Sequence, residues 1–322
     1  MRPHRLFVAH CLFLSGLVST AIAQDEGKAL GPGHHALKIN AAGHTWHYAV
    51  QVPKDYDGTK PVPMVLVLHG AGGGGEAYLK NAGWAKKADE AGFLAVAPDG
   101  LPAGPDAEPS FLTNPRLWNS GQLRPLSPRA AIDDKVFFTA LLDDVAKRWK
   151  LDPDRVYLTG HSNGGGMTFR LGFEMSERFA ALAPVASGFW IVPRRSTPKR
   201  PLPTLFIIGT EDPLVPLAGG ERTLPWGKSY VPPMERTLEN WSKAQGCPYE
   251  AKVRKDENGV KVVDYGPGTD GVMFTVVYIE GHGHGWPGGK ALLNSAMMGP
   301  ISSKVDATDM IWDFFREKTR AK

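Results

Sequence analysis

Short apolar runs alternate with longer amphipathic segments along most of the chain. The apolar runs have the length of buried strands, and they read MVLVLH, FLAVAP, VYLTG, FAALAPV, TLFIIG and MFTVVYIE. Helical periodicity follows in five segments, at residues 76–91, 133–149, 165–174, 233–245 and 304–318. Strands that alternate with helices indicate a mostly parallel twisted sheet with helices on both faces. The sequence therefore predicts the α/β fold class.

A pair of segments near the N-terminus has a different pattern. HHALKIN and HTWHYAVQVP each alternate with a period of two and stand close together in the chain. Such alternation is typical of half-buried strands. We therefore expect an N-terminal antiparallel hairpin at the edge of the sheet.

The run Gly160-His161-Ser162-Asn163-Gly164 lies between the strand VYLTG and a helical segment. A GxSxG turn between a strand and a helix holds a serine in a strained conformation at the top of a sheet, and the glycines leave room for the turn. A Gly-rich turn without chemistry is the plainer alternative, but the flanking strand and helix favour a nucleophile. We expect Ser162 to be that nucleophile.

A general base should follow the serine in the chain order Ser, acid, His. Of the ten histidines, only His282 and His284 come after Ser162, and both lie in the Gly-rich segment EGHGHGWPGG after a late strand. A loop after a late strand is where the base belongs in this order. Spacing alone leaves the choice between the two histidines open.

The acid candidate is Asp212, directly after the buried-type strand TLFIIG, with its neighbour Glu211 as the weaker option. Asp256, Asp264 and Asp270 lie in polar, hairpin-like sequence instead. An ordinary acidic turn at residues 211–213 is the alternative without chemistry.

Negative charge that develops on a substrate needs hydrogen-bond donors, and the segment LVLHGAGGGG offers them after an early strand. One donor should be the backbone N–H of the residue after the nucleophile, Asn163, and the other should come from this early loop. We predict Ala71, with Gly70 and Gly72 as neighbouring options. A phosphate-binding loop is disfavoured because the segment lacks the GK[ST] ending.

With these residues in view, the chain resembles the polyhydroxybutyrate depolymerase and feruloyl esterase family of secreted α/β-hydrolases. The resemblance covers almost all of the mature chain through PMVLVLHGAGG, the segment from AIDDKVF to GGGMTFRL, RFAALAPVAS, PLPTLFIIGTEDPLVPLAGG and GHGHGWPGG. It implies an α/β-hydrolase serine esterase with Ser162 as nucleophile, Asp212 as acid and His284, in the HxWPG motif, as base. The implied substrates are feruloyl or acetyl esters on polysaccharide, or hydroxyalkanoate oligomers.

The sequence departs from the family pattern in two places. Family members usually pair the cysteine at the position of Cys247 with a later one, whereas the only other cysteine here is Cys11. We therefore expect a single thiol and no internal disulfide in the mature chain. Residues 224–233 look like an extended loop beside the acid-bearing turn.

The N-terminal segment and the composition predict an exported protein of one domain. Arg2 and Arg5, an apolar stretch and Ala21-Ile22-Ala23 read as a signal peptide over residues 1–23, too short for a membrane anchor. Residues 24–322 should form one esterase domain, secreted or periplasmic and monomeric. The net charge is +4, and cleavage would lower it to about +2. Such a balance disfavours a nucleic-acid partner, so the expected partner is an ester substrate.

Several aromatic residues fall in loops near the predicted site. Trp118, Trp190, Trp226 and Trp286 could stack on a substrate, and of these we predict substrate contacts for Trp118 and Trp286, together with His161. The position of Trp286, two residues after the predicted base, favours instead a role that wedges the histidine loop in place. Residues 98–128 have little regular structure and should form one wall of the cleft, anchored by Trp118.

Other activities fit the sequence less well. The histidine pairs lack accompanying ligands at zinc spacing, so we predict no metal site, and serine acyl transfer needs no cofactor. A serine peptidase of the same fold would need an anchor for a peptide terminus. A catalytically silent binding protein would lack a member of the triad, and none is missing.

Overall fold

The structure is a computed structural model that describes residues 29–123, 125–191, 197–225, 227–290 and 295–320. The predicted signal peptide, together with Cys11 and Trp226, lies outside the described residues.

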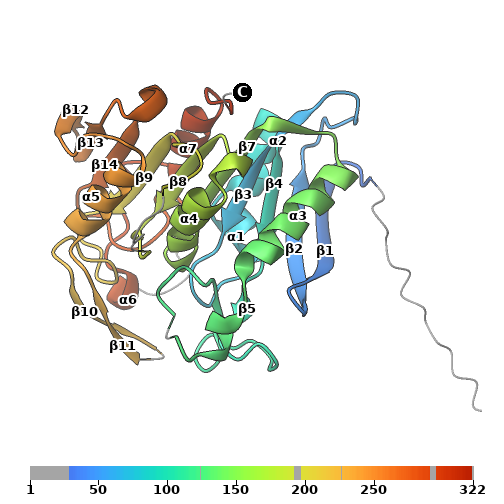
Figure 1. The fold of residues 1–322 in the computed structure, drawn as a ribbon, viewed down its shortest axis with the longest axis horizontal. Helices are drawn as coiled ribbons and strands as arrows, with labels where there is room; N and C mark the ends of the chain where they lie inside the picture. The colour runs from blue at the N-terminus through green and yellow to red at the C-terminus, as the bar shows by residue number, and fades with distance from the viewer. Residues whose placement is uncertain (1–28, 124, 192–196, 226, 291–294, 321–322) are drawn as a thin grey trace, which may run out of the picture.

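A ten-stranded sheet forms the centre of the molecule (Figure 1). Its order is β1-β2-β4-β3-β7-β8-β9-β14-β13-β12. The strands are β1 (Gly33–Ala41), β2 (His44–Val52), β3 (Val62–Leu68), β4 (Leu94–Pro98), β7 (Leu151–His161), β8 (Ala181–Val185), β9 (Thr204–Gly209), β12 (Ala251–Glu257), β13 (Val260–Tyr265) and β14 (Phe274–Ile279). Neighbours from β4 through β14 are parallel. The predicted mostly parallel sheet is therefore confirmed.

Antiparallel hairpins close both edges of this sheet. The predicted N-terminal hairpin is β1–β2, and β2 continues the sheet by pairing with β4. At the opposite edge β14 pairs with β13, and β13 pairs with β12. The seven residues of β12, AKVRKDE, are all exposed. Charged side chains along an edge strand disfavour pairing with another chain.

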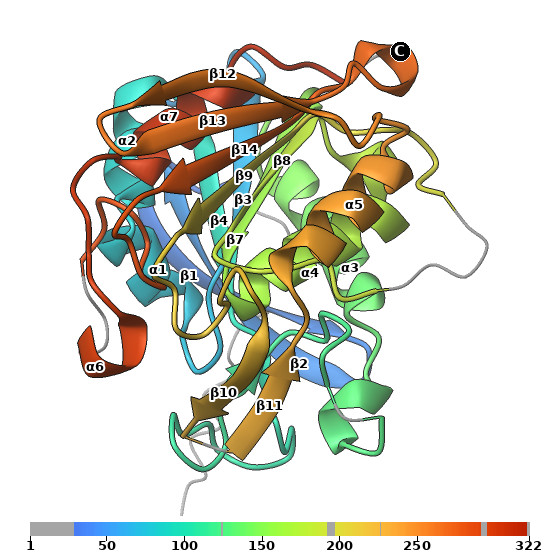
Figure 2. The same ribbon diagram turned by 90° about the vertical axis from the view of Figure 1, so that its left-hand side faces the viewer.

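Helices cover both faces of the sheet because successive strand residues point to opposite sides. Met64, Leu66 and Leu68 of β3 pack into the cluster that contains α3 (Asp134–Arg148), α4 (Asn163–Glu174) and α5 (Met234–Ala244). Val65 and Val67 pack into the other cluster, with α1 (Gly75–Asn81), α2 (Trp84–Ala91) and α7 (Ala307–Phe315). Figures 1 and 2 show the two helical layers.

The helix boundaries differ from the prediction in three places. The single helix expected at residues 76–91 is two helices, because Gly83 between them has a left-handed φ of 79°. The helix after Ser162 begins at Asn163, two residues earlier than expected. The last long helix begins at Ala307, where the side chain of Asp306 accepts a hydrogen bond from the N–H of Asp309. Side chains of this kind commonly fix a helix start.

Two segments outside the main sheet lie at the same end of the molecule (Figures 1 and 2). The first segment runs from the end of β4 to the start of α3. Its regular elements are the short strands β5 (Leu101–Pro102) and β6 (Arg116–Leu117) and a 3-10 helix at Pro128–Ala131, and its other described residues are irregular. The second is a separate two-stranded sheet of β10 (Gly220–Leu224) and β11 (Gly227–Val231). The loop expected at residues 224–233 is thus mostly the second half of a hairpin. The remaining short elements are α6 (Ser295–Met298) and 3-10 turns at Ser176–Arg178 and Thr269–Gly271.

Cys247 is a free, buried thiol directly after α5. Its Sγ lies 3.5 Å from the carbonyl oxygen of Val272, and burial raises the pKa of the thiol. Within the described ranges, no helix is both long enough and apolar enough to cross a membrane.

Candidate active site

Ser162 occupies the sharp turn between β7 and α4. Its φ is 55° and its ψ is −118°, outside the backbone regions that residues other than glycine normally occupy. The Ser162 N–H donates to the carbonyl oxygen of Val185 in β8, which helps to hold the turn. A strained residue of this kind needs support from its surroundings, and such residues cluster at functional sites.

The two glycines of the GxSxG sequence give the turn its room. A Cβ at Gly164 would lie 2.4 Å from the carbonyl oxygen of Leu68, at the end of the neighbouring strand β3. A Cβ at Gly160 would lie 2.5 Å from the carbonyl oxygen of Gly164. Both distances are too short for a carbon and a backbone oxygen, so neither position can accept a larger residue without movement of the backbone.

His284 lies between Ser162 and Asp212, in the loop after β14. Its Nε2 is 2.7 Å from Oγ of Ser162, and its Nδ1 is 2.7 Å from Oδ2 of Asp212. The imidazole is almost fully buried. With Nδ1 protonated toward the carboxylate, Nε2 is free to accept the hydroxyl proton of the serine.

His282 points into its own loop instead. The N–H of Ser302 donates to its Nδ1 at 3.0 Å, and its Nε2 lies 2.9 Å from the carbonyl oxygen of Gly285. Both ring nitrogens are therefore engaged with backbone atoms. The structure thus brings His284 to the serine and makes His282 a support for the loop that carries it.

Asp212 follows β9 and is held by the turn that it begins. Its Oδ1 accepts hydrogen bonds from the N–H groups of Leu214 and Val215, each at 2.8 Å. Burial alone would raise the pKa of Asp212, but the adjacent His284 and the three hydrogen bonds lower it overall. The carboxylate is therefore charged at neutral pH. Glu211, the weaker candidate, is exposed and is not brought to the serine.

The predicted oxyanion donors lie beside the serine. Ala71 and Asn163 line the same cleft as Ser162. Among the described residues, no hydrogen bond engages the backbone N–H of either one. Two free N–H groups beside the predicted nucleophile match the arrangement that stabilises a developing oxyanion.

Trp118 joins the two segments that carry the predicted oxyanion donors, and it does not line the cleft. Its indole N–H donates to the carbonyl oxygen of His69 at 3.0 Å. Its backbone exchanges two hydrogen bonds with the side-chain amide of Asn163. The side chain is fully buried against Phe137 and Phe138. The predicted substrate contact of Trp118 is therefore wrong, whereas its predicted role as an anchor of residues 98–128 is confirmed.

His69 was not expected to matter, yet it organises the early loop. Its Nδ1 lies 2.7 Å from the carbonyl oxygen of Gly70, and its Nε2 accepts the N–H of Gly100 at 2.9 Å. Complete burial lowers the pKa of His69, so the ring is neutral. The single sequence signal was its place directly after a buried strand.

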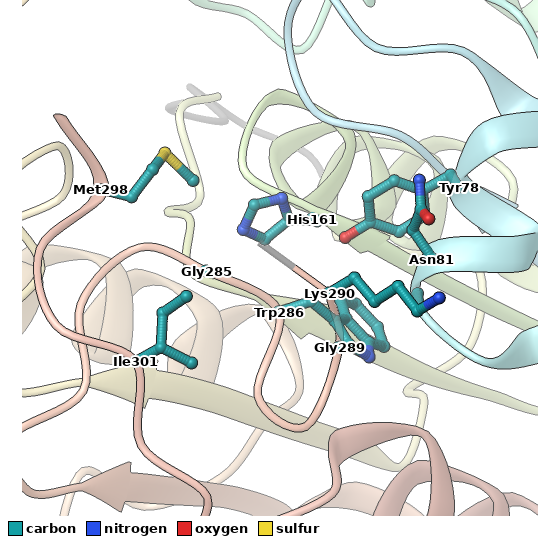
Figure 3. A pocket seen from close by; sticks show the side chains of 10 residues that line it. Tyr78, Asn81, His161, Gly285, Trp286, Gly289, Lys290, Met298 and Ile301 are labelled. Atoms are coloured by element: carbon teal, nitrogen blue, oxygen red, sulfur yellow. The ribbon is translucent and has the colours of Figure 1, made fainter. Parts of the chain in front are cut away.

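His161 and Trp286 line a separate small cavity (Figure 3) of about 30 Å³. The Nε2 of His161 lies 2.6 Å from the carbonyl oxygen of His284, and the indole N–H of Trp286 donates to Oγ1 of Thr308. Tyr78 packs against both rings. Neither residue lines the cleft that holds Ser162. The structure therefore does not bring the two predicted substrate contacts into that cleft. Both rings lie against Tyr78 of α1, and Trp286 also bonds to α7, which agrees with the wedge role that its position favoured.

His161 gives a testable pH dependence of stability. Burial, followed by the nearby His284, lowers the pKa of His161 to about 3, while an unfolded histidine titrates near 6.5. Between these pH values the unfolded chain binds more protons than the folded chain. The contribution of His161 to the free energy of unfolding is therefore complete above about pH 6.5 and declines as the pH falls toward 3. From pH 7 to pH 5 the loss should be about 2 kcal/mol.

Urea unfolding of His161→Gln at the two pH values measures this contribution. The variant should lose about 2 kcal/mol less than the wild type between pH 7 and pH 5. The amide nitrogen of glutamine can still donate to the His284 carbonyl. His47→Gln, at an exposed position of β2, is the control and should behave as the wild type. Equal losses in the wild type and in His161→Gln would contradict the prediction.

The cleft that holds Ser162 has a volume of about 250 Å³. One wall comes from residues 98–128, through Ala103, Leu117, Gln122, Leu123 and Ser127, as the sequence predicted. The β10–β11 hairpin forms another wall, through Arg222, Leu224, Gly227, Lys228 and Ser229. Trp190 also lines the cleft, and among the tryptophans of the set that the structure describes it is the one placed there.

No group of three or more histidine, cysteine or acidic side chains that could hold a metal ion occurs in the parts of the chain that the structure describes.

Comparison with known proteins gives a consistent result. The family described as "Putative esterase" matches residues 39–263, which is more than half of the chain. Putative esterase NocK from Nocardia uniformis subsp. tsuyamanensis is 31% identical over 268 residues, 78% of this chain and 73% of that protein. Feruloyl esterase B from Piromyces equi is 28% identical over 247 residues, 75% of this chain and 43% of that protein. This chain thus matches less than half of the length of the second relative.

The fold agrees with a solved structure of low sequence identity. The acetyl xylan esterase from Aspergillus awamori has a TM-score of 0.58 at 14% identity, over 88% of this chain and 99% of that one. The resemblance to feruloyl esterases expected from the sequence is also confirmed. The chain belongs to this esterase family, has the α/β-hydrolase fold and is a carboxylic ester hydrolase.

Proposed function

We propose that this esterase acts through a Ser162–His284–Asp212 triad and a covalent acyl-enzyme. The observation that carries the proposal is the continuous chain of two 2.7 Å hydrogen bonds from Ser162 Oγ through His284 to the Asp212 carboxylate. A serine hydroxyl is a weak nucleophile until a base accepts its proton, and this geometry supplies the base.

In the proposed first step, His284 Nε2 takes the proton of Ser162 while Oγ forms a bond to the ester carbonyl carbon. The carbonyl oxygen becomes an oxyanion, which the N–H groups of Asn163 and Ala71 stabilise. The ester C–O bond then breaks, and the imidazolium returns its proton to the leaving alcohol. Asp212 stays ionised and stabilises the imidazolium. Water then attacks the acyl carbon while His284 Nε2 takes one of its protons. The bond between that carbon and Ser162 Oγ breaks, the imidazolium returns the proton to Oγ, and the carboxylic acid leaves.

We further propose that the natural ester is a feruloyl or acetyl group on a polysaccharide, or an ester bond of a hydroxyalkanoate oligomer. The names of the relatives support the first two classes, since they include a feruloyl esterase and an acetyl xylan esterase. The signal-like sequence at residues 1–23 supports export, and the rest of the chain is proposed to form one domain.

The test combines a substrate panel with covalent labelling of the mature protein. The panel contains 4-nitrophenyl acetate, methyl ferulate, acetylated xylan and a hydroxybutyrate oligomer. Turnover should occur with the activated acetate and with at least one natural-type ester. Diisopropyl fluorophosphate should abolish it, and peptide mass spectrometry should place one adduct on Ser162, because only an activated serine is phosphorylated quickly.

Two outcomes would contradict the proposal. One is complete silence on all four esters. The other is an inhibited enzyme whose adduct lies on a residue other than Ser162, which would leave the esterase assignment intact but require a different nucleophile.

A further inference from the structure

The cleft beside Ser162 has an uneven charge. Its lining includes the basic residues Arg129, Arg222 and Lys228, and among the described residues that line it none is acidic. A cleft lined by charges of one sign attracts a substrate group of the opposite sign.

The three cations do not contribute equally to the positive charge that a ligand in the cleft would meet. Arg129 is fully buried, and its Nη2 contacts both carboxylate oxygens of Asp134, at 2.6 and 2.8 Å. Its charge is therefore balanced within the protein. Lys228 is exposed, where solvent and salt screen its charge. Arg222 is the cation that remains.

Arg222 lies half-buried on β10, in the hairpin wall of the cleft. Its Nε donates to Oγ of Ser229 at 2.9 Å and its Nη1 donates to the carbonyl oxygen of Leu214 at 3.1 Å. Among the described residues, no carboxylate lies within ion-pair distance of its guanidinium. Of the five N–H donors of an arginine, these two bonds engage two.

The environment of Arg222 favours an anionic ligand. Burial lowers the pKa of Arg222, and the charge of Asp212 opposes this effect only in part. A partly desolvated guanidinium without a carboxylate partner is unfavourable, and a carboxylate that binds through two parallel N–H···O bonds is its best complement. Leu214 also connects Arg222 to Asp212, because its N–H donates to Asp212 while its carbonyl oxygen accepts from Arg222. The anion site therefore lies beside the proposed triad.

We propose that Arg222 binds a carboxylate of the substrate, so that the preferred esters carry a negative charge close to the ester bond. The inference rests on the proposed function and adds a substrate class to it. The carboxylate can belong to the acyl part, as in a half-ester of a dicarboxylic acid. It can also belong to the alcohol part, as at the acid end of a hydroxyalkanoate oligomer.

Two matched substrate pairs separate these sources. For the acyl side, 4-nitrophenyl hydrogen adipate is compared with 4-nitrophenyl hexanoate, which has the same chain length without the carboxylate. For the alcohol side, 3-butyryloxybutyrate is compared with 3-butyryloxybutyramide. Spontaneous hydrolysis is subtracted in every case. The wild type should prefer the carboxylate member of at least one pair by about 10- to 100-fold in kcat/KM, mainly through KM.

Arg222→Gln should remove this preference while it changes kcat/KM on the neutral esters by less than about 3-fold. Arg222→Lys keeps the charge without the planar pair of donors, so it should retain part of the preference. Arg236→Gln, at an exposed position of α5 outside the cleft lining, is the matched control and should leave the preference unchanged.

A measurement on the wild type alone covers the case of a variant that does not fold. Adipate should inhibit hydrolysis of the neutral 4-nitrophenyl ester competitively, at concentrations at least 10-fold lower than adipamide. This binding test needs no substitution and no particular leaving group.

Three results would overturn the inference: equal kcat/KM within both pairs, equal inhibition by adipate and adipamide, or an Arg222→Gln variant that loses the same factor on charged and neutral esters. The last result would make Arg222 a positioning residue for Leu214 and the Asp212 turn. Failure of the proposed function is distinct, since it would abolish serine-dependent hydrolysis of the neutral esters as well.

Discussion

Replacing Ser162 with alanine should lower kcat on 4-nitrophenyl acetate by about 10⁴- to 10⁶-fold. The substitution removes the oxygen that lies 2.7 Å from His284, so no acyl-enzyme can form. The free N–H groups of Ala71 and Asn163 stay in place, which leaves some stabilisation of the oxyanion and a small residual rate. Steady-state release of nitrophenolate by the purified variant measures the loss.

Ser187→Ala is a matched control for this experiment. Ser187 is a buried serine that lines the same cleft, and its hydroxyl makes no hydrogen bond within the described structure. This variant should keep at least about a tenth of the wild-type kcat, and thermal unfolding of both variants should show that they are folded. If Ser162→Ala kept more than a hundredth of the wild-type rate, the proposed nucleophile would be wrong.

Replacing His284 with alanine should lower kcat by about 10⁴-fold or more, whereas His282→Gln should cost less than about 10-fold. The difference follows from their contacts, because His284 joins Ser162 to Asp212 while both ring nitrogens of His282 contact backbone atoms. His282→Gln should instead lower the melting temperature, since it disturbs the support of the histidine loop.

Rates and melting temperatures of the two variants separate a base from a structural histidine. A large loss of kcat in His282→Gln with an unchanged melting temperature would reverse the assignment. Similar losses in both variants, accompanied by unfolding of His284→Ala, would leave Asp212→Asn as the deciding variant. It should cost about 10⁴-fold if Asp212 orients the base.

The positions of Ser162, Asp212 and His284 could be predicted because each follows a strand of a parallel sheet. The strands β7, β9 and β14 were visible as apolar runs, and parallel strands bring their carboxyl ends to one edge. Chain order then limited the histidines to two. Only the family resemblance preferred His284, since the two residues occupy the same loop and differ only in the contacts that the folded chain gives them.

The errors concern side chains whose direction depends on distant parts of the chain. Trp118 was assigned to the substrate, but it bonds to His69 and Asn163, which are 49 and 45 positions away. His161 and Trp286 were also named as substrate contacts, but their rings lie against Tyr78 of α1, on the far side of the histidine loop from the cleft lining. A tryptophan in a loop looks the same in sequence whether it packs inward or outward. The break at Gly83 was missed because a glycine can also occur within a helix.

The hairpin of β10 and β11 forms its own small sheet, separate from the ten-stranded sheet whose loops carry the proposed triad. This hairpin supplies one wall of the cleft, including Arg222. Neither of its strands belongs to the central sheet. Selection, or a protein engineer, can therefore exchange this hairpin as a unit and change which esters fit. The residues of the proposed triad would keep their places after the strands of the central sheet, so substrate range and chemistry can diverge independently in this scaffold.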